Sequence, residues 1–360
     1  MTHRHAPLAL ALLLPAVALA QDPVLRPVAA ADTPDFALDD LDAASLRQAI
    51  AEERRLLRAR PDDPVSLGGV PTTRRALLAT LERLDALLDL EPAARAAAIT
   101  SEFACYRSVG HDGQGTVLYT GYHSPCFDAS RVRSERLRTP VRRPPPDLPR
   151  GPSFTRRQID GEGALDGQGL ELVWMAPLDA FLLEVQGSGS ARLEDGSIVR
   201  LQYARSNGHP YTSLGKELVK DGKITPEEAS IQAIRAYFER HPEDVDEYLF
   251  RNASYVFFHE TEDPPRGCAG AAVTAGRSIA TDKRLFPAGA LAFVVVDLPL
   301  FEGERVVAWR PTARLVVDQD TGGAIRGAGR VDLYMGGDDA AEAAAGVLKR
   351  DGALYYLLLR

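Results

Sequence analysis

The chain has 360 residues, of which 45% are hydrophobic and 26% are charged. This length and composition predict a globular protein of two domains with a sizeable core. The formal net charge of −8 argues against nucleic acid or an anionic membrane surface as the main partner.

Residues 1–20 predict a secretory signal peptide that is not part of the fold. Residues 3–5 (His-Arg-His) make a polar, basic start, an apolar run follows, and residues 18–20 (Ala-Leu-Ala) offer a small-x-small cleavage site. The apolar run is short for a membrane anchor. No cysteine follows the cleavage site, so an N-terminal lipid anchor is not supported. We therefore expect an exported, soluble mature protein.

Three helices are predicted in the N-terminal third, from Asp42 to Arg60, from Thr73 to Leu90 and from Pro92 to about Thr100. The second is strongly amphipathic, with leucines at helical spacing. These segments carry no cluster of chemically active side chains, so we assign them to packing and to covering the core.

After Glu102 the pattern becomes mostly β. The first expected segments are a strand at 116–122, an extended proline-rich surface connector at 139–152, and strands within 170–198 that include 181–185. They are followed by a helix starting at Thr225, a helix at 243–250, a strand at 254–258, a turn and a strongly apolar strand (291–296) within 279–297, a helix at 339–349 and a last strand at 354–359. Helices followed by many short strands and glycine turns indicate a mostly β, barrel-rich α+β fold in two domains.

Acidic side chains gather in one segment, residues 315–337, which predicts two short strands joined by glycine-rich turns. Asp318, Asp320 and Asp332 stand there among apolar residues and glycines. Asp-Gly turns are common in hairpins. The density of carboxylates nevertheless favours an active site, because burial and like charges raise a carboxyl pKa.

Other chemistries fit the sequence less well. Asp318-x-Asp320 resembles the start of a calcium loop, but Gly322 and Gly329 stand at two required ligand positions. No zinc motif occurs, and the glycines around Ser188 lack the context of a phosphate loop or a nucleophilic serine. We expect no metal and no cofactor.

The three cysteines, Cys105, Cys126 and Cys268, leave two alternatives open. In an oxidising compartment Cys105 and Cys126 could form a disulfide, or all three could be buried free thiols. An odd count leaves at least one thiol unpaired within a monomer.

The remaining candidate chemistry is acid–base catalysis by carboxylates on a sugar substrate. Ordinary glycosidases use two carboxylates, and Asp320 and Asp332 could serve if the turns bring them together. Aromatic, amide and hydroxyl side chains at glycine-rich strand ends would suit an exported saccharide-binding protein.

Several long sequence segments, taken together as markers, make the chain resemble one family, the membrane-bound lytic transglycosylase A family of peptidoglycan-cleaving enzymes. The markers, in chain order, are TGY (120–122), QIDGEGALDGQGLELVW (158–174), DAFLLEVQGSG (179–189), RLEDGSIVRLQYARSNGHPYTSLGKEL (192–218), NASYVFF (252–258), GRSIATDKRLFPAG (276–289) and QDTGGAIRGAGRVDLYMG (319–336). The resemblance spans roughly residues 102–359.

The resemblance implies a double-psi β-barrel catalytic domain with an inserted smaller β-domain and N-terminal helices. Residues 21–122 plus 262–360 would form the catalytic domain, with its three-aspartate part at about 270–360. Residues 123–261 would form the inserted β-domain. Peptidoglycan glycan strands would lie in the groove between the two domains, and proteins of cell-wall synthesis are conceivable partners.

The resemblance also assigns site residues. By match, Asp332 is the catalytic acid, Asp320 is the supporting carboxylate and Asp282 is the third motif aspartate, while Asp318 is expected to be a strand-end charge. The expected groove residues are Thr120, Gly121, Tyr122, Gln186, Gly187, Ser188, Gly189 and Asn207.

The implied reaction is non-hydrolytic cleavage between N-acetylmuramic acid and N-acetylglucosamine, which leaves a 1,6-anhydro sugar. The alternatives are a hydrolytic muramidase that uses Asp332 and Asp320 as acid and base, and a non-catalytic, expansin-like glycan binder. This chain departs from the family pattern in two places. It carries Ala-Leu-Ala-Gln where known members carry a lipid-anchoring cysteine, which favours a periplasmic protein that is soluble or peripherally associated with the outer membrane. It also reads His123-Ser124-Pro125 after TGY, which alters the expected groove contacts there.

Overall fold

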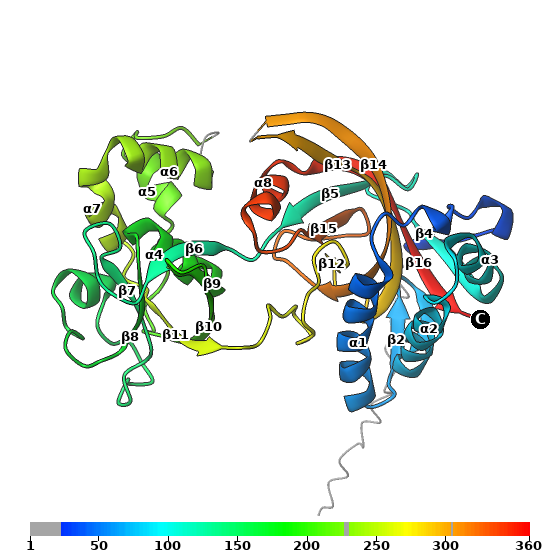
Figure 1. Ribbon diagram of the computed structural model, residues 1–360, viewed down its shortest axis with the longest axis horizontal. Helices are drawn as coiled ribbons and strands as arrows, with labels where there is room; N and C mark the ends of the chain where they lie inside the picture. Colours follow the sequence, from blue (N-terminus) through cyan, green and yellow to red (C-terminus); the bar gives the residue numbers. More distant parts are fainter. Residues whose placement is uncertain (1–22, 227–229, 304) are drawn as a thin grey trace, which may run out of the picture.

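The computed structural model describes residues 23–226, 230–303 and 305–360. The predicted signal peptide at 1–20 lies outside these residues. The described chain forms two lobes joined by extended segments (Figure 1). One lobe holds the N-terminal helices and a sheet built from both ends of the chain, and the other holds the middle of the chain.

Six strands of the first lobe close into a barrel. Hydrogen bonding runs in the order β16-β13-β14-β12-β15-β5, and β5 pairs back onto β16. The pairs β12–β14 and β15–β5 are parallel, and the others are antiparallel. The strands are β5 (Val117–Tyr122), β12 (Ser278–Ala280), β13 (Ala290–Glu302), β14 (Arg305–Asp320), β15 (Arg330–Tyr334) and β16 (Lys349–Leu359). The predicted fold class, a mostly β protein with a double-psi barrel, is confirmed.

Helices and two further strands extend and cover the barrel. β4 pairs with β16 and β1 pairs with β4. Leucines of the second helix, Leu77, Leu81 and Leu84, share one buried cluster with barrel residues such as Leu291. The elements are β1 (Leu25–Val28), α1 (Ala43–Ala59), β2 (Pro64–Leu67), β3 (Val70–Thr73), α2 (Arg74–Leu87), α3 (Pro92–Glu102), β4 (Phe103–Ser108) and α8 (Asp339–Val347). The covering role predicted for the N-terminal helices matches this packing.

The second lobe is a six-stranded sheet with helices packed on it, in the order β11-β10-β9-β6-β8-β7. Its strands are β6 (Cys126–Ser130), β7 (Thr139–Arg142), β8 (Glu171–Met175), β9 (Ser188–Arg192), β10 (Ile198–Ser206) and β11 (Val256–Thr261), and its α-helices are α4 (Pro177–Gln186), α5 (Leu214–Lys220), α6 (Ile231–Arg240) and α7 (Val245–Phe250). The chain enters this lobe between β5 and β6 and leaves it after β11 (Figure 1).

Three local predictions were wrong. Residues 181–185 lie inside α4, which starts with Pro177 and ends at left-handed Gly187. The connector at 139–152 is not all surface, because β7 is buried over Pro140, Val141 and Arg142. The helix expected from Thr225 begins instead at Ile231, with Ser230 as its N-cap. Between β14 and β15, the strands that carry the acidic segment, the sheet places β12.

The three cysteines are free thiols in the structure: Cys105 is buried, Cys126 is half-buried and Cys268 is exposed. Within the described residues, no helix is both long and apolar enough to cross a membrane. The same residues contain no group of three or more His, Cys, Asp or Glu side chains that could hold a metal ion.

Candidate active site

The barrel places the two aspartates of the acidic segment in one row across neighbouring strands. Ala280 on β12 is in register with Asp320 on β14 and with Asp332 on β15. Asp332 is in turn in register with Thr120 on β5. Since neighbouring strands lie about 4.8 Å apart, the aspartates stand two strand spacings apart, roughly 9–10 Å between Cα atoms.

Asp332 is half-buried and is held by one hydroxyl. The Thr120 hydroxyl donates a hydrogen bond to Asp332 Oδ1, and the Arg330 guanidinium donates to Thr120 Oγ1 at 2.9 Å. Burial raises the pKa of Asp332, and the charge of Asp320 adds to the rise, while the Thr120 hydrogen bond and the charge of Arg330 oppose it. Burial is the largest of these effects, so the protein favours the neutral acid mainly by removing water from it.

Asp320 is fixed as an acceptor by three donors. The Tyr122 hydroxyl donates to Asp320 Oδ2 at 3.0 Å. The backbone N–H groups of Cys268 and Thr321 donate to Oδ1 at 2.9 and 2.8 Å. Burial and the Asp320 charge raise the pKa of Tyr122 well above its usual value, so the phenol keeps its proton and remains a donor. Both carboxylate oxygens of Asp320 are therefore held by donors, whereas only Oδ1 of Asp332 accepts a hydrogen bond from the described residues.

Asp318 is not the strand-end charge that was expected. Its side chain is fully buried and accepts hydrogen bonds from Thr281 at 2.7 Å, from Tyr356 at 2.7 Å and from Lys283. Burial raises its pKa against these partners. Asp318 thus ties β14 to β16 and to the residues that directly follow β12.

Asp282 is likewise buried and engaged in structure. Its carboxylate pairs with Arg284 and accepts the backbone N–H of Gly327 at 2.8 Å. The hydrogen bonds from Arg284 hold the pKa of Asp282 well below its usual range. Of the three motif aspartates, only Asp320 and Asp332 therefore lie in the row across the strands.

The TGY segment supplies the neighbours of this row. A Cβ on Gly121 would lie 2.8 Å from the backbone of Ala345 on α8, so only glycine allows the helix to pack this closely. The Tyr122 ring packs against Tyr334 with 5.1 Å between centroids. The Tyr334 hydroxyl is 2.8 Å from the Ser124 hydroxyl, so the contacts lead from the barrel toward the second lobe.

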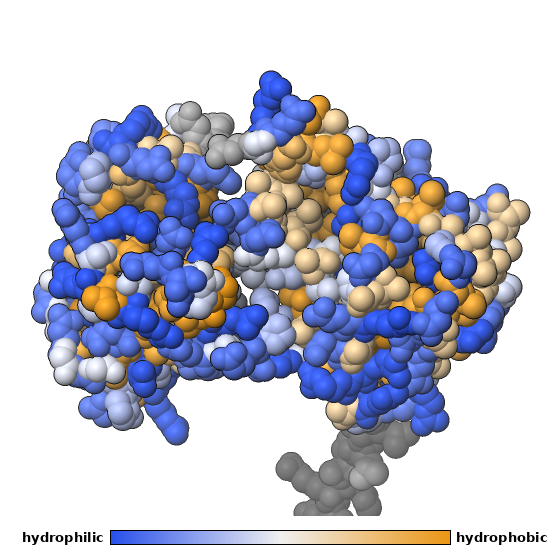
Figure 2. Space-filling view, viewed as in Figure 1, coloured by the Kyte–Doolittle hydropathy of each residue, from blue (hydrophilic) through white to orange (hydrophobic). Residues whose placement is uncertain are grey.

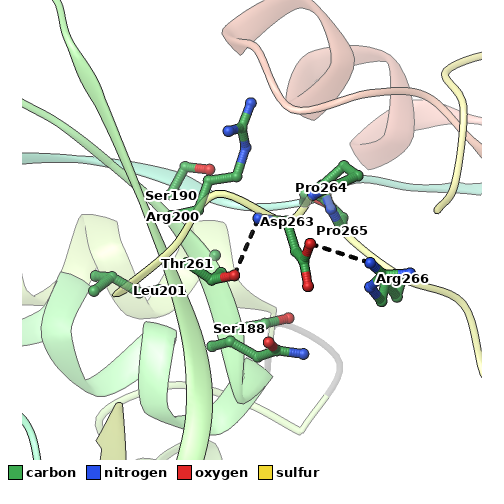
Figure 3. Close-up of a pocket in the computed structure, with 12 residues that line it drawn as sticks. Ser188, Ser190, Arg200, Leu201, Thr261, Asp263, Pro264, Pro265 and Arg266 are labelled. Carbon is green, nitrogen blue, oxygen red and sulfur yellow. Dashed lines mark hydrogen bonds and ion pairs between the residues drawn. The ribbon is translucent and has the colours of Figure 1, made fainter. Parts of the chain in front are cut away.

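A pocket lies beside Ser124 where the two lobes meet (Figure 3). It is lined from the second lobe by β9 and β10 and from the connection after β11, with Ser188, Gly189, Ser190, Arg200, Thr261 and Asp263 among its residues. Figure 2 shows the surface hollowed between the lobes. Ser124, which lines this pocket, also contacts Tyr334, two residues after Asp332 on β15.

Of the remaining predicted groove residues, the structure brings some to the pocket and buries one elsewhere. Ser188 and Gly189 line the pocket, and Gln186 and Gly187 lie directly before them at the end of α4. Asn207 is not in the cleft: it is 1% exposed, and its amide donates to the carbonyls of Phe154 and Ala253 at 2.9 and 2.8 Å. Its amide ties loops of the second lobe together.

Sequence reasoning missed two of the three further residues that the geometry brings to the site. Arg330 and Tyr334 stand two residues before and after Asp332, on the same face of β15, and Ser124 follows the TGY segment. The alternation of a strand could have identified the first two, because residues i and i+2 share a face. Ser124 belongs to the His123-Ser124-Pro125 segment, which the sequence had marked as a change in the groove contacts.

Comparisons with known proteins agree with this architecture. Residues 118–259 match the family model described as the MltA specific insert domain, and residues 277–358 match the 3D domain. Membrane-bound lytic murein transglycosylase A of Escherichia coli K12 is 36% identical over 251 residues, which cover 69% of this chain and 67% of that protein.

Solved structures give the same result. The lytic transglycosylase LtgG of Burkholderia pseudomallei is 32% identical with a TM-score of 0.63, and the match covers 95% of this chain and 97% of that one. E. coli MltA with bound chitohexaose is 26% identical with a TM-score of 0.66, over 94% and 96% of the two chains.

The fold and the matches define an enzyme of the class that cleaves peptidoglycan as lytic transglycosylases do. The chain belongs to the MltA family of lytic murein transglycosylases.

Proposed function

We propose that Asp332 is the single acid and base of the lytic transglycosylase reaction, and that Asp320 supports it. The observation that carries this proposal is the difference between the two carboxylates. Burial raises the pKa of Asp332, whereas Asp320 accepts three hydrogen bonds from fixed donors. A carboxyl group that keeps its proton can act as a general acid.

The reaction proceeds without water as a reactant. Asp332 gives its proton to the glycosidic oxygen between N-acetylmuramic acid and N-acetylglucosamine as the C1–O bond breaks. The 6-hydroxyl of the same muramyl residue attacks C1, and Asp332, now ionised, takes the hydroxyl proton. The products are a 1,6-anhydromuramyl end and a free 4-hydroxyl, and Asp332 recovers its starting state.

Asp320 suits a supporting role. The developing positive charge at C1 is stabilised by a nearby negative charge that does not have to reorient. Its hydrogen bonds to Tyr122 and to two backbone N–H groups supply that fixed orientation. Its charge also raises the pKa of Asp332, but less than burial does.

The cleft between the lobes is the place we propose for the glycan. The Asp332 row lies on the barrel side, and Ser188 and Gly189 lie on the other side. The solved E. coli relative was obtained with chitohexaose, a chain of β-1,4-linked sugars. We propose accordingly that residues 21–122 plus 262–360 form the catalytic domain, that residues 123–261 form the opposite wall, and that the enzyme works on peptidoglycan strands in the periplasm, soluble or peripherally associated with the outer membrane.

The test compares Asp332→Asn with Asp320→Asn on purified murein sacculi. Asp332→Asn cannot carry the proton and should release no anhydromuropeptides while its thermal unfolding stays cooperative. Asp320→Asn keeps the acid and should retain measurable turnover at a rate reduced by about 100-fold, the order found when one electrostatic donor is removed from an active site. Wild-type rates in Asp332→Asn would overturn the assignment of the acid.

A further inference from the structure

Arg330 has no part in the proposed reaction so far, and its environment is unusual. Its terminal nitrogen donates to Thr120 Oγ1 at 2.9 Å, which is its one side-chain hydrogen bond to the described residues. Its Nε is buried without a partner there, and it forms no ion pair with any described carboxylate. A cation held with an unsatisfied donor costs free energy, and such groups are concentrated at functional sites.

The Arg330 hydrogen bond determines how the Thr120 hydroxyl is turned. A guanidinium has donors only, so Thr120 Oγ1 accepts from Arg330. The positive charge then repels the single hydroxyl proton, which points away from Arg330 and toward Asp332 Oδ1. Without Arg330 the hydroxyl could turn round and accept the proton of neutral Asp332, which would withdraw that proton from the substrate.

We propose that Arg330 is a positioning residue that acts through Thr120 to keep Oδ1 of Asp332 an acceptor, so that the catalytic proton is carried on Oδ2. No described residue makes a hydrogen bond to Oδ2, so this oxygen faces no competing acceptor. The same oxygen then gives the proton to the glycosidic oxygen and takes it back from the 6-hydroxyl. This inference rests on the proposed role of Asp332.

Arg330 also acts on Asp332 through its charge, and the two effects have to be separated. The groups around Asp332 are Arg330 on its own strand, Tyr334 beyond it, Asp320 on β14, Tyr122 on β5, and Lys349 on β16, which is in register with Thr120. Because the charge of Arg330 lowers the pKa of Asp332, its removal should move the alkaline limb of the activity profile to higher pH.

A double-mutant cycle separates positioning from charge. The plateau kcat on murein sacculi is measured against pH for the wild type, Arg330→Met, Thr120→Val and the double variant. We expect each single variant to lose about 10-fold or more in plateau kcat, the size expected for one hydrogen bond to a charged group. The double variant should lose less than about 2-fold beyond Thr120→Val, because Arg330 then has no hydroxyl to orient.

Two further variants serve as controls. Thr120→Ser keeps the hydroxyl, so Arg330→Met should cost the same factor in that background as in the wild type. Arg326→Met removes an exposed arginine from the preceding turn and should leave plateau kcat unchanged. The Arg326 guanidinium donates to the carbonyls of Gly322 and Ile325.

Each outcome tests either the positioning role of Arg330 or the proposed lytic transglycosylase function. Multiplying losses in the double variant, or an Arg330→Met enzyme with wild-type plateau kcat, would overturn the positioning role. A loss in Arg330→Met that is absent from the Thr120→Ser background would overturn it as well. If the wild type itself released no anhydromuropeptides, the proposed function would fail instead, so the two failures cannot be confused.

Discussion

Replacing Glu53 with glutamine tests the cost of a charge buried between α1 and the barrel. Glu53 is 1% exposed. Its Oε2 accepts a hydrogen bond of 3.2 Å from Gln319 Nε2, while its Oε1 is buried with no hydrogen-bond partner among the described residues. Burial, opposed by the Gln319 hydrogen bond, raises the pKa of Glu53 to about 7.

The sign and size of the effect follow from this pKa. The folded pKa lies above the ordinary value of 4.5, so the folded chain binds the proton more tightly than the unfolded chain does. The free energy of unfolding of the wild type therefore falls as the pH rises from about 4.5 to about 7 and stays low above that range. The difference between the folded and the unfolded pKa corresponds to a loss of ~3 kcal/mol in the free energy of unfolding. Glutamine keeps an acceptor for Gln319 and never ionises.

Urea unfolding at pH 4.5 and pH 8 measures the difference. Glu53→Gln should be more stable than the wild type by ~3 kcal/mol at pH 8 and should differ from it by less than about 1 kcal/mol at pH 4.5. Glu91→Gln, a change at an exposed position before α3, should stay within about 0.5 kcal/mol at both pH values. A glutamine variant that is less stable than the wild type at pH 8 would refute the reasoning.

Three further changes test other parts of the site. Lys283→Met leaves the buried charge of Asp318 without its cation and should lower the free energy of unfolding by about 3–5 kcal/mol, measured in urea. Tyr122→Phe removes the hydroxyl that orients Asp320 and should reduce kcat on sacculi by about 10-fold with little change in the melting temperature. Gly121→Ala puts a methyl group 2.8 Å from the backbone of α8 and should destabilise the protein by about 1–3 kcal/mol, again measured in urea.

The sequence was most informative where a pattern extends over many residues. The leucine spacing of the second helix and the long ordered markers identified the helical cover, the fold class and the family correctly. Segments with conflicting signals were less predictable. Residues 181–185 are apolar and short, so periodicity could not separate a strand from a buried helix, and the deciding features were Pro177 at the start and left-handed Gly187 at the end.

The candidate site depends on contacts between distant residues, which one sequence does not reveal. Asp318 and Asp320 are two residues apart, yet one is buried among Lys283, Tyr356 and Thr281 while the other receives Tyr122. Asn207 looked like a polar turn residue suited to a groove, but its amide is used within the second lobe. Strand order and long-range pairing decide these roles.

The central claim is that this chain breaks the glycosidic bond without water through Asp332. The most direct measurement is digestion of purified murein sacculi in H₂¹⁸O, followed by mass spectrometry of the released fragments. The account predicts fragments that end in 1,6-anhydromuramic acid, are lighter by one water than reducing fragments, and carry no ¹⁸O. Reducing muramic acid ends that carry one ¹⁸O would contradict it and would identify a hydrolase.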